Sequence, residues 1–299
     1  MSRRYDLVHV DVFTDRPLAG NQLAVVLDAR GIGDEEMQAI AREMNLAETT
    51  FVLPVTRPEC AAHIRIFTPG REVPFAGHPT VGTAWVLATR GLLPKGARRF
   101  LLEERIGPVP VDLEGDPARP TFIWMHHGEP TFGPAVGDRA GMAKALRLDE
   151  SDVLPPPIQV VTTGNPFLFV PLRDRAAVDR ALLDVPALLA CVGDDGGIGV
   201  FVFAPDGAGR VYSRMFAPHT AGIPEDPATG SASGPLGAYL VRHGLAPSSG
   251  EVAILSEQGV KMKRPSQVHI RLRASGGRVT DIRVGGGVAP VLEGCLTLP

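Results

Sequence analysis

The sequence predicts an α+β fold of two pseudo-symmetric domains, each a curled, mostly antiparallel sheet around a central helix. Three observations support this prediction. Short apolar runs typical of strands outnumber helical patterns, two pairs of related motifs recur in the same order, and the second motif of each pair opens a helix. The 299 residues are enough for two domains of ordinary size.

Two pairs of short motifs indicate the internal repeat. A Gly-Asn turn followed by an apolar strand occurs at residues 20–27 and again at residues 164–170. A loop that contains proline and leads into small residues occurs at residues 77–84 and again at residues 225–232, an alignment that matches His78 with Asp226. Because both pairs keep the same order and nearly the same separation, we expect a duplicated domain.

Strands are predicted wherever short β-branched and apolar runs occur between turn residues. These runs are residues 7–13, 23–27, 50–54, 63–67, 109–113, 121–125, 199–204, 212–216, 268–272 and 279–284. Few of them alternate with helices in the regular way of a parallel α/β sheet. We therefore expect mostly antiparallel sheets.

Each half is predicted to hold one central helix, at residues 80–90 and 229–243, because proline lies near the first turn and glycine follows the end. The second of these helices is rich in Gly, Ala and Ser, which suits close packing on all sides. Peripheral helices are expected at residues 34–44, where Asp34 can cap the start, and at residues 139–146 and 175–183.

The domain boundaries are expected near residue 127, giving domains 1–127 and 128–285. The tail 286–299 is expected to return to the first domain, whose sheet would otherwise lack a strand. Two segments are candidate linkers because of their Gly and Pro content, residues 128–137 and the Pro-rich residues 154–157.

Composition excludes several classes of function. With 44% hydrophobic and 21% charged residues, the chain has the composition of a compact globular protein. A formal net charge of -3 offers no general attraction to nucleic acid or to an anionic membrane. No apolar signal core and no run of about 20 apolar residues is present, so we expect a cytoplasmic location. The cysteines Cys60, Cys191 and Cys295 are too far apart for a metal motif, and we expect reduced, buried thiols.

The two proline-containing loops are the first candidate site. Each opens onto a helix N-terminus, where backbone N–H groups lack helical partners and the helix dipole favours an anion. If the halves face each other, His78 and Asp226 approach one cleft from opposite sides, and a small carboxylate is the implied ligand. The alternative is that these glycines only allow tight turns.

Glu48 is the candidate acid/base. It lies where a polar turn leads from an amphipathic helix into an apolar strand, and partial burial there would raise its pKa from about 4.3 toward neutrality. The residue at the corresponding distance in the second half is Val192, so the repeat carries this carboxylate once. The alternative is a capping or solvated surface glutamate.

Motifs for other chemistries are absent from the sequence. We find no P-loop, no dinucleotide-binding glycine motif, no zinc-protease motif and no nucleophile elbow. The scattered histidines have no recognisable ligand spacing. We therefore expect neither a cofactor nor a metal ion.

The chain resembles the PhzF-like proteins, a family named for the phenazine-biosynthesis isomerase and similar in fold to diaminopimelate epimerase. The similar segments run nearly from end to end: residues 11–14, 20–21, 45–51, 73–80, 164–166, 214–218, 225–232 and 257–259. The resemblance implies two similar domains with the active site between them, and a homodimer. It also implies that Glu48 is the catalytic glutamate and that His78, Asp226 and Ser231 occupy other active-site positions. The substrate-binding candidates in these segments are Asn21, Gly77, Thr80, Asn165, Gly230 and Ser231.

The sequence departs from the family pattern at two places. Ala47 stands where many members have Ser, and His219-Thr220 adds bulk before residues 221–223. Both departures concern the choice of substrate more than the chemistry. Related epimerases use one cysteine from each central loop, but none of the three cysteines here lies in those loops, so a two-thiol racemisation is not supported.

We therefore expect a cofactor-independent isomerase that moves a proton between carbons of a small carboxylate. An epimerase or racemase acting on a small amino or hydroxy acid is the enzyme alternative. A non-catalytic protein that binds a small ligand on the same scaffold is the alternative from another class, although such a protein has no need of an acid/base residue.

Overall fold

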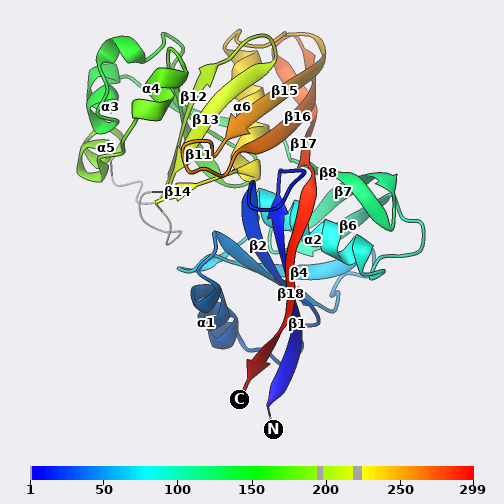
Figure 1. The fold of residues 1–299 in the computed structure, drawn as a ribbon. Coiled ribbons are helices and arrows are strands. Elements are labelled where there is room, and N and C mark those ends of the chain that lie inside the picture. The colour runs from blue at the N-terminus through cyan, green and yellow to red at the C-terminus, as the bar shows by residue number, and fades with distance from the viewer. Residues whose placement is uncertain (1, 194–197, 218–223) are drawn as a thin grey trace. The chain divides into compact units, whose positions relative to one another are not determined.

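The computed structural model describes residues 2–193, 198–217 and 224–299. Its contacts divide the chain into two compact units, Met1–His126 with Val284–Pro299, and His127–Arg283. Each unit combines a mixed sheet with a few helices, so the α+β class expected from the sequence is confirmed (Figure 1). The two candidate linkers, residues 128–137 and 154–157, both lie inside the second unit instead of joining the units.

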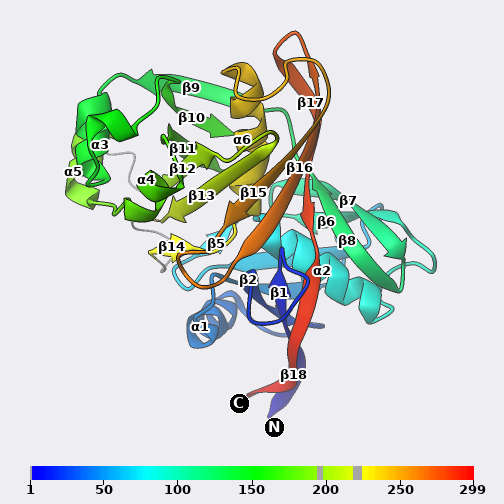
Figure 2. The same ribbon diagram turned by 45° about the horizontal axis from the view of Figure 1, so that its top comes forward.

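The first unit is built on one long mixed sheet. Its strands pair in the order β18–β1–β2–β3–β4–β6–β7–β8, with β5 on β4; β2–β3 and β4–β6 are parallel and the other pairs antiparallel. The C-terminal β18 runs beside the N-terminal β1 along its whole length (Figure 2). The elements are β1 Arg3–Val12, β2 Asn21–Val26, α1 Asp34–Met44, β3 Glu48–Leu53, β4 Ala62–Phe67, β5 Glu72–Val73, α2 Gly77–Thr89, β6 Arg99–Glu104, β7 Gly107–Asp116, β8 Arg119–His126 and β18 Val288–Leu298.

The second unit repeats this plan. Its strands pair in the order β9–β10–β11–β12–β13–β15–β16, with β14 on β13, and β11–β12 and β13–β15 are the parallel pairs. The elements are β9 Thr131–Val136, α3 Arg139–Ala145, a 3-10 turn Glu150–Asp152, β10 Ile158–Thr162, β11 Pro166–Pro171, α4 Arg175–Arg180, α5 Val185–Val192, β12 Gly199–Pro205, β13 Arg210–Phe216, β14 Glu225–Asp226, α6 Gly230–Arg242, β15 Gly250–Gln258, β16 Ser266–Ser275 and β17 Arg278–Gly286, whose last three residues belong to the first unit.

The repeated topology confirms the duplication and corrects one alignment within it. Leu23 of β2 lies opposite Glu48, and the matching Phe167 of β11 lies opposite Gly199. The second-half equivalent of Glu48 is therefore Gly199 and not Val192. Counting along the sequence failed because the second unit has α4 and α5 where the first has only α1. The position still carries a carboxylate in one half alone.

A second alignment was also wrong, the match of His78 with Asp226. The helices α2 and α6 begin at Gly77 and Gly230, which places His78 opposite Ser231 in the repeat. The first turns agree with this register, because the hydroxyl four residues after each N-cap donates to the N-cap carbonyl, Thr80 to Ala76 and Ser233 to Thr229. Asp226 instead lies in the short strand β14, which corresponds to β5.

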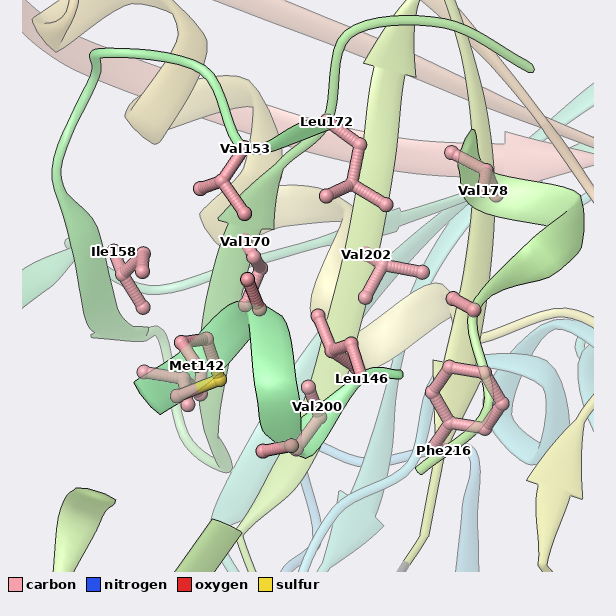
Figure 3. Close-up of a cluster of buried hydrophobic side chains, with 14 of the residues drawn as sticks. Met142, Leu146, Val153, Ile158, Val170, Leu172, Val178, Val200, Val202 and Phe216 are labelled. Atoms are coloured by element: carbon pink, nitrogen blue, oxygen red, sulfur yellow. The ribbon is translucent and has the colours of Figure 1, made fainter. Parts of the chain in front are cut away.

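Helices cover both faces of the second sheet. Alternate residues of a strand point to opposite faces, so neighbouring residues contact different helices. Even-numbered residues of β11 and β12, such as Val170 and Val202, pack against α3 and α4 in the cluster of Figure 3. The odd-numbered Phe169 and Phe203 contact Tyr239 of α6 on the other face. The central helix is thus enclosed, as its small residues predict.

In the first unit, α2 packs against β1, β2 and β3. The approach is close at Gly82, where an added Cβ would lie 2.6 Å from Leu23 Cδ2 and 2.8 Å from Val12 Cγ2. The helix α1 places Met37 and Ile40 in a separate apolar cluster with other residues of the sheet. Glycine at position 82 is therefore needed for packing.

Some local expectations were wrong. The N-cap of α1 is Gly33, whose N–H bonds the Glu36 carboxylate, while Asp34 pairs with Arg65. Only Cys60 is buried; Cys191 is half-buried and Cys295 is exposed on β18, which presents much of its surface to solvent. The sequence did not predict the strands β6, β9, β10 and β15 or the helix α5. Some of these segments mix apolar residues with polar residues or with Gly and Pro, and others are short.

Among the residues that the structure describes, no helix is both long and apolar enough to cross a membrane.

Candidate active site

Glu48, His78 and Asn21 come together in the first unit, each at the start of an element. Glu48 is the first residue of β3, Asn21 the first of β2, and His78 the second of α2. The parallel pairing of β2 with β3 brings the two strand starts to the same edge of the sheet. Glu48 thus lies at the junction of the turn and the strand, as the sequence indicated, and the strand begins two residues earlier than expected.

The His78 ring bridges Asn21 and Glu48. Its Nε2 lies 3.2 Å from the carbonyl oxygen of Gln22 and 3.4 Å from Glu48 Oε2. The Gln22 carbonyl can only accept a hydrogen bond, and so can Glu48 Oε2 when Glu48 is ionised. Nε2 therefore carries the proton. Nδ1 is then the acceptor, which matches the Nδ2 amide group of Asn21 at 3.0 Å. The hydrogen-bond partners thus select the neutral Nε2–H tautomer.

Burial of the His78 ring also favours its neutral state. His78 is 3% exposed, and desolvation lowers its pKa from 6.5 to about 3, against a smaller opposing effect of the Gln22 carbonyl. The ring is therefore neutral near pH 7. Its Nε2 proton is directed at the Gln22 carbonyl, so the 3.4 Å approach of Glu48 Oε2 to the neutral ring is a close polar contact and neither a hydrogen bond nor an ion pair.

The start of α2 offers few free backbone donors. Pro79 has no N–H, and the N–H of Thr80 bonds the carbonyl of Ala76 at 3.4 Å. The N–H groups of Gly77 and His78 remain as the donors of the first turn. Thr80 itself is fully buried, and its hydroxyl bonds the Ala76 carbonyl, so its side chain does not support a substrate-binding role.

Glu104, which sequence reasoning missed, lies behind this helix start. It is the last residue of β6 and is 3% exposed, and its Oε1 lies 2.5 Å from the Thr80 hydroxyl. The Thr80 hydroxyl lies within donating distance of both the Ala76 carbonyl and Glu104 Oε1, and its single proton can be donated to only one of them at a time. Desolvation raises the pKa of Glu104 to about 8, against a smaller opposing effect of the hydrogen bond from Thr80, so this carboxyl is mostly protonated near pH 7. Its signal in the sequence was a carboxylate closing an apolar strand.

In the second unit, Asp226 lies at the end of β14, four residues before α6. It is 6% exposed, and its Oδ2 accepts a hydrogen bond of 2.6 Å from the hydroxyl of Thr229, the N-cap of α6. The N–H of Thr229 donates to the Oε1 atom of Gln258 at 3.0 Å. It is therefore not free to bind a ligand, contrary to the expectation of free N–H groups at this helix start.

The remaining candidates are placed as follows. Gly230 and Ser231 are the first two residues of α6, equivalent to Gly77 and His78 of α2, and both are buried. Asn165 is half-buried in the turn between β10 and β11. His219 and Thr220 lie outside the described residues. Among the residues that are described, no three His, Cys, Asp or Glu side chains come together in a way that could hold a metal ion.

Comparisons with known proteins identify the family. A family model described as phenazine biosynthesis-like protein matches residues 10–294. The trans-2,3-dihydro-3-hydroxyanthranilate isomerase of Pseudomonas aeruginosa is 40% identical over 296 residues, covering 96% of this chain and 97% of that protein. The crystal structure of a Bacillus anthracis phenazine biosynthesis protein of the PhzF family is 28% identical with a TM-score of 0.88, covering 99% of this chain and 100% of that one.

A more distant likeness concerns the fold alone. A hydroxyproline epimerase from Agrobacterium vitis is 13% identical, with a TM-score of 0.70 over 99% of this chain and 93% of that one. The epimerase-like fold expected from the sequence is thereby confirmed. With the family model covering nearly the whole chain and a relative named an isomerase at 40% identity, this chain belongs to the phenazine biosynthesis-like (PhzF) family and is an isomerase.

Proposed function

We propose that this enzyme moves a proton between two carbons of a small unsaturated carboxylate, with Glu48 as its acid/base and without a cofactor. Glu48 removes a proton from a carbon that the substrate's unsaturation or carboxylate activates. The electron pair is delocalised over the conjugated system. The protonated Glu48 then returns the proton to another carbon of the same molecule, so one residue serves first as base and then as acid.

The observation that carries this proposal is the contact between Glu48 and His78. Glu48 Oε2 lies 3.4 Å from Nε2 of an enclosed, neutral imidazole. A neutral imidazole beside the carboxylate gives its ionised form none of the strong stabilisation that a cation at this distance would give. The base therefore stays reactive. Glu48 is also only 18% exposed, a degree of burial that limits competing hydration.

The substrate's carboxylate would be held at helix starts. The N–H groups of Gly77 and His78 are the donors left in the first turn of α2, and a helix N-terminus favours an anion. Gly230 and Ser231 occupy the same positions in α6. We propose that these residues, with Asn21, Asn165 and Asp226, orient the substrate and stabilise developing negative charge.

The first substrate to test is trans-2,3-dihydro-3-hydroxyanthranilate, because the relative at 40% identity is named for its isomerisation. This molecule has the required features, an unsaturated ring and a carboxylate. Positions 219 and 220, where the sequence departs from the family pattern, lie outside the described residues, so a panel of cyclic and amino-acid carboxylates should accompany it.

Racemisation by two thiols is less well supported. The first turns of α2 and α6 contain no cysteine, and Cys60, Cys191 and Cys295 lie before β4, in α5 and in β18. A one-base epimerisation on the same scaffold would use Glu48 as well, but would return the proton to the carbon that lost it.

The experiment is incubation of each acid with the enzyme in D₂O, followed by ¹H and ²H NMR of the recovered molecule. We expect movement of a double bond, with deuterium at the carbon that gains the proton to the extent that the protonated Glu48 exchanges with D₂O before it returns the proton. Deuterium at the original carbon with inverted configuration would indicate an epimerase. Binding of an acid with neither movement of a double bond nor exchange at carbon would instead indicate a non-catalytic protein and contradict the proposal.

A further inference from the structure

Gln258, at the end of β15, has its side-chain amide fully enclosed in the second unit. Its Oε1 accepts from the backbone N–H of Thr229 at 3.0 Å, and its Nε2 donates to the backbone carbonyl of Asp226 at 2.8 Å. A backbone N–H can only donate and a backbone carbonyl can only accept, so these two partners fix the orientation of the amide. Its NH₂ group also faces the Thr229 hydroxyl at 3.0 Å.

This orientation determines where the Thr229 proton goes. Thr229 Oγ1 accepts a hydrogen bond from Gln258 Nε2, and its own single proton is directed at Asp226 Oδ2, 2.6 Å away. The Asp226 oxygen is therefore an acceptor. A hydrogen bond donated to a carboxylate favours its ionised form and fixes its orientation.

We infer that Gln258 and Thr229 form a positioning relay, in which the Gln258 amide orients the Thr229 hydroxyl so that it donates to Asp226 and keeps that carboxylate ionised and fixed. The relay lies entirely within the second unit. Its consequence for catalysis rests on the proposed function, in which Asp226 orients the substrate and assists charge redistribution.

The repeat of the fold supports a special role for this position. Thr49 pairs with Phe67 and the equivalent Val200 pairs with Phe216, so β4 of the first unit corresponds to β13 of the second. The strands β6 and β15, which pair in parallel with β4 and β13, therefore also correspond. Glu103 lies opposite His63 and Glu257 opposite Tyr212, so the next residues, Glu104 and Gln258, are equivalent. Each bonds a threonine at the start of its central helix.

Among the described residues, the charged side chains on the strands next to Asp226 are paired with one another. On β13 and β14, Arg214 forms a two-pronged ion pair with Glu225, and on β15 Glu257 pairs with Arg175. The turn after β15 adds the cations Lys261, Lys263 and Arg264. Neither Thr229 nor Gln258 takes part in these ion pairs. A change in the titration midpoint of Asp226 in the variants would therefore result from loss of the relay.

The test compares Thr229→Val, which removes the hydroxyl but keeps the branched shape, with Thr229→Ser, which retains it. The readout is ¹³C NMR of protein labelled at the aspartate carboxyl carbon and titrated without substrate, with Asp226→Asn identifying the signal. We expect the midpoint of the Asp226 signal to rise by roughly one pH unit in Thr229→Val and to stay near that of the wild type in Thr229→Ser. If Thr229→Val does not fold, Thr229→Ala also lacks the hydroxyl and replaces it.

Gln258→Met tests the other half of the relay, since it keeps the length but cannot donate. A rise in the midpoint smaller than that in Thr229→Val supports orientation by Gln258, and an unchanged midpoint would remove Gln258 from the relay. An unchanged midpoint in Thr229→Val would overturn the inference as a whole.

The NMR titration separates this inference from the proposed function. If Asp226→Asn turned over substrate as well as the wild type, the assigned role of Asp226 would fail while the titration could still show the relay. If Asp226 is needed for turnover, the acidic limb of the pH profile of kcat/KM should move to higher pH in Thr229→Val and return in Thr229→Ser. A merely structural role of Thr229 would not move that limb.

Discussion

At the scale of single residues, the neutral state of His78 follows from partners on both ring nitrogens. Nε2 faces the acceptors Gln22 O and Glu48 Oε2, and Nδ1 faces the Asn21 amide. Desolvation, which lowers the pKa of His78 to about 3, removes any tendency to hold a second proton near neutrality. The imidazole is thus a fixed, neutral neighbour of Glu48 across the pH range in which most enzymes work.

The first prediction concerns Asn21→Asp. A carboxylate beside Nδ1 accepts a hydrogen bond from a protonated Nδ1 and stabilises the imidazolium, so the pKa of His78 should rise and turnover should fall as Glu48 gains a cationic partner. ¹⁵N NMR of the histidine rings measures this directly. Wild-type His78 should show a protonated Nε2 and an unprotonated Nδ1 from pH 5 to 8, whereas two protonated nitrogens in the wild type at pH 6 would contradict the assignment.

At the scale of elements, the ends of β6 and β15 close the starts of the two central helices with equivalent side chains, Glu104 and Gln258. A protonated carboxyl and a primary amide both present one acceptor and at least one donor. The first unit therefore uses a neutral acid where the second uses an amide.

This equivalence predicts the effect of Glu104→Gln on stability. The folded-state pKa of Glu104, about 8, lies above the ordinary value of 4.5, so its contribution is fully present below pH 4.5 and is lost as pH rises through 8. The amide variant lacks this loss. Relative to the wild type, it should gain up to about 1.4 kcal/mol in free energy of unfolding per pH unit across this window.

Urea unfolding at pH 5, 6.5 and 8 measures that difference. His78 acts in the opposite sense, since its lowered pKa gives a contribution that is present above pH 6.5 and lost as pH falls toward about 3. It is common to both proteins and cancels in the comparison. A difference in unfolding free energy that stays constant from pH 5 to 8 would show that Glu104 is already ionised in the folded protein.

Close packing of the central helix gives the next prediction, for Gly82→Ala. In an ordinary helix interior this change stabilises by about 1 kcal/mol. Here the new Cβ would lie 2.6 Å from Leu23 Cδ2, so we expect the free energy of unfolding to fall by about 1–3 kcal/mol instead. Thermal and urea unfolding test the sign. Adding Leu23→Val should recover part of the loss, and stabilisation by Gly82→Ala alone would mean that the helix does not approach the sheet this closely.

At the scale of the whole molecule, the sequence predicted the class of fold because the motifs of the repeat are local. Turn residues, prolines and small residues mark both copies, and most of the helices lie within a few residues of their expected bounds. Strands with mixed polarity, such as β15, gave no clear pattern. Their pairing depends on partners distant in the sequence, which one chain does not reveal.

The candidate site was predictable to a similar extent. Glu48, His78 and Asn21 were chosen from motifs and lie together in the first unit, although their catalytic roles stay predictions. The alignment of His78 with Asp226 failed because Gly and Pro letters matched while the helix starts did not. Glu104 and Gln258 were not chosen as site residues, since their importance lies in burial and in hydrogen bonds to another element. The homodimer implied by the family resemblance also stays a prediction.

Proton transfer by Glu48 is the central claim, and deuterium incorporation from D₂O by Glu48→Gln tests it most directly. The amide keeps the size and shape of the side chain but cannot accept a proton, so exchange into an accepted acid should fall by about 10²- to 10⁴-fold while the Kd for that acid changes little. The neighbouring Ala47→Ser serves as the matched control and should exchange at close to the wild-type rate. Near wild-type exchange by purified, folded Glu48→Gln would contradict the mechanism and make Asp226 the next residue to test.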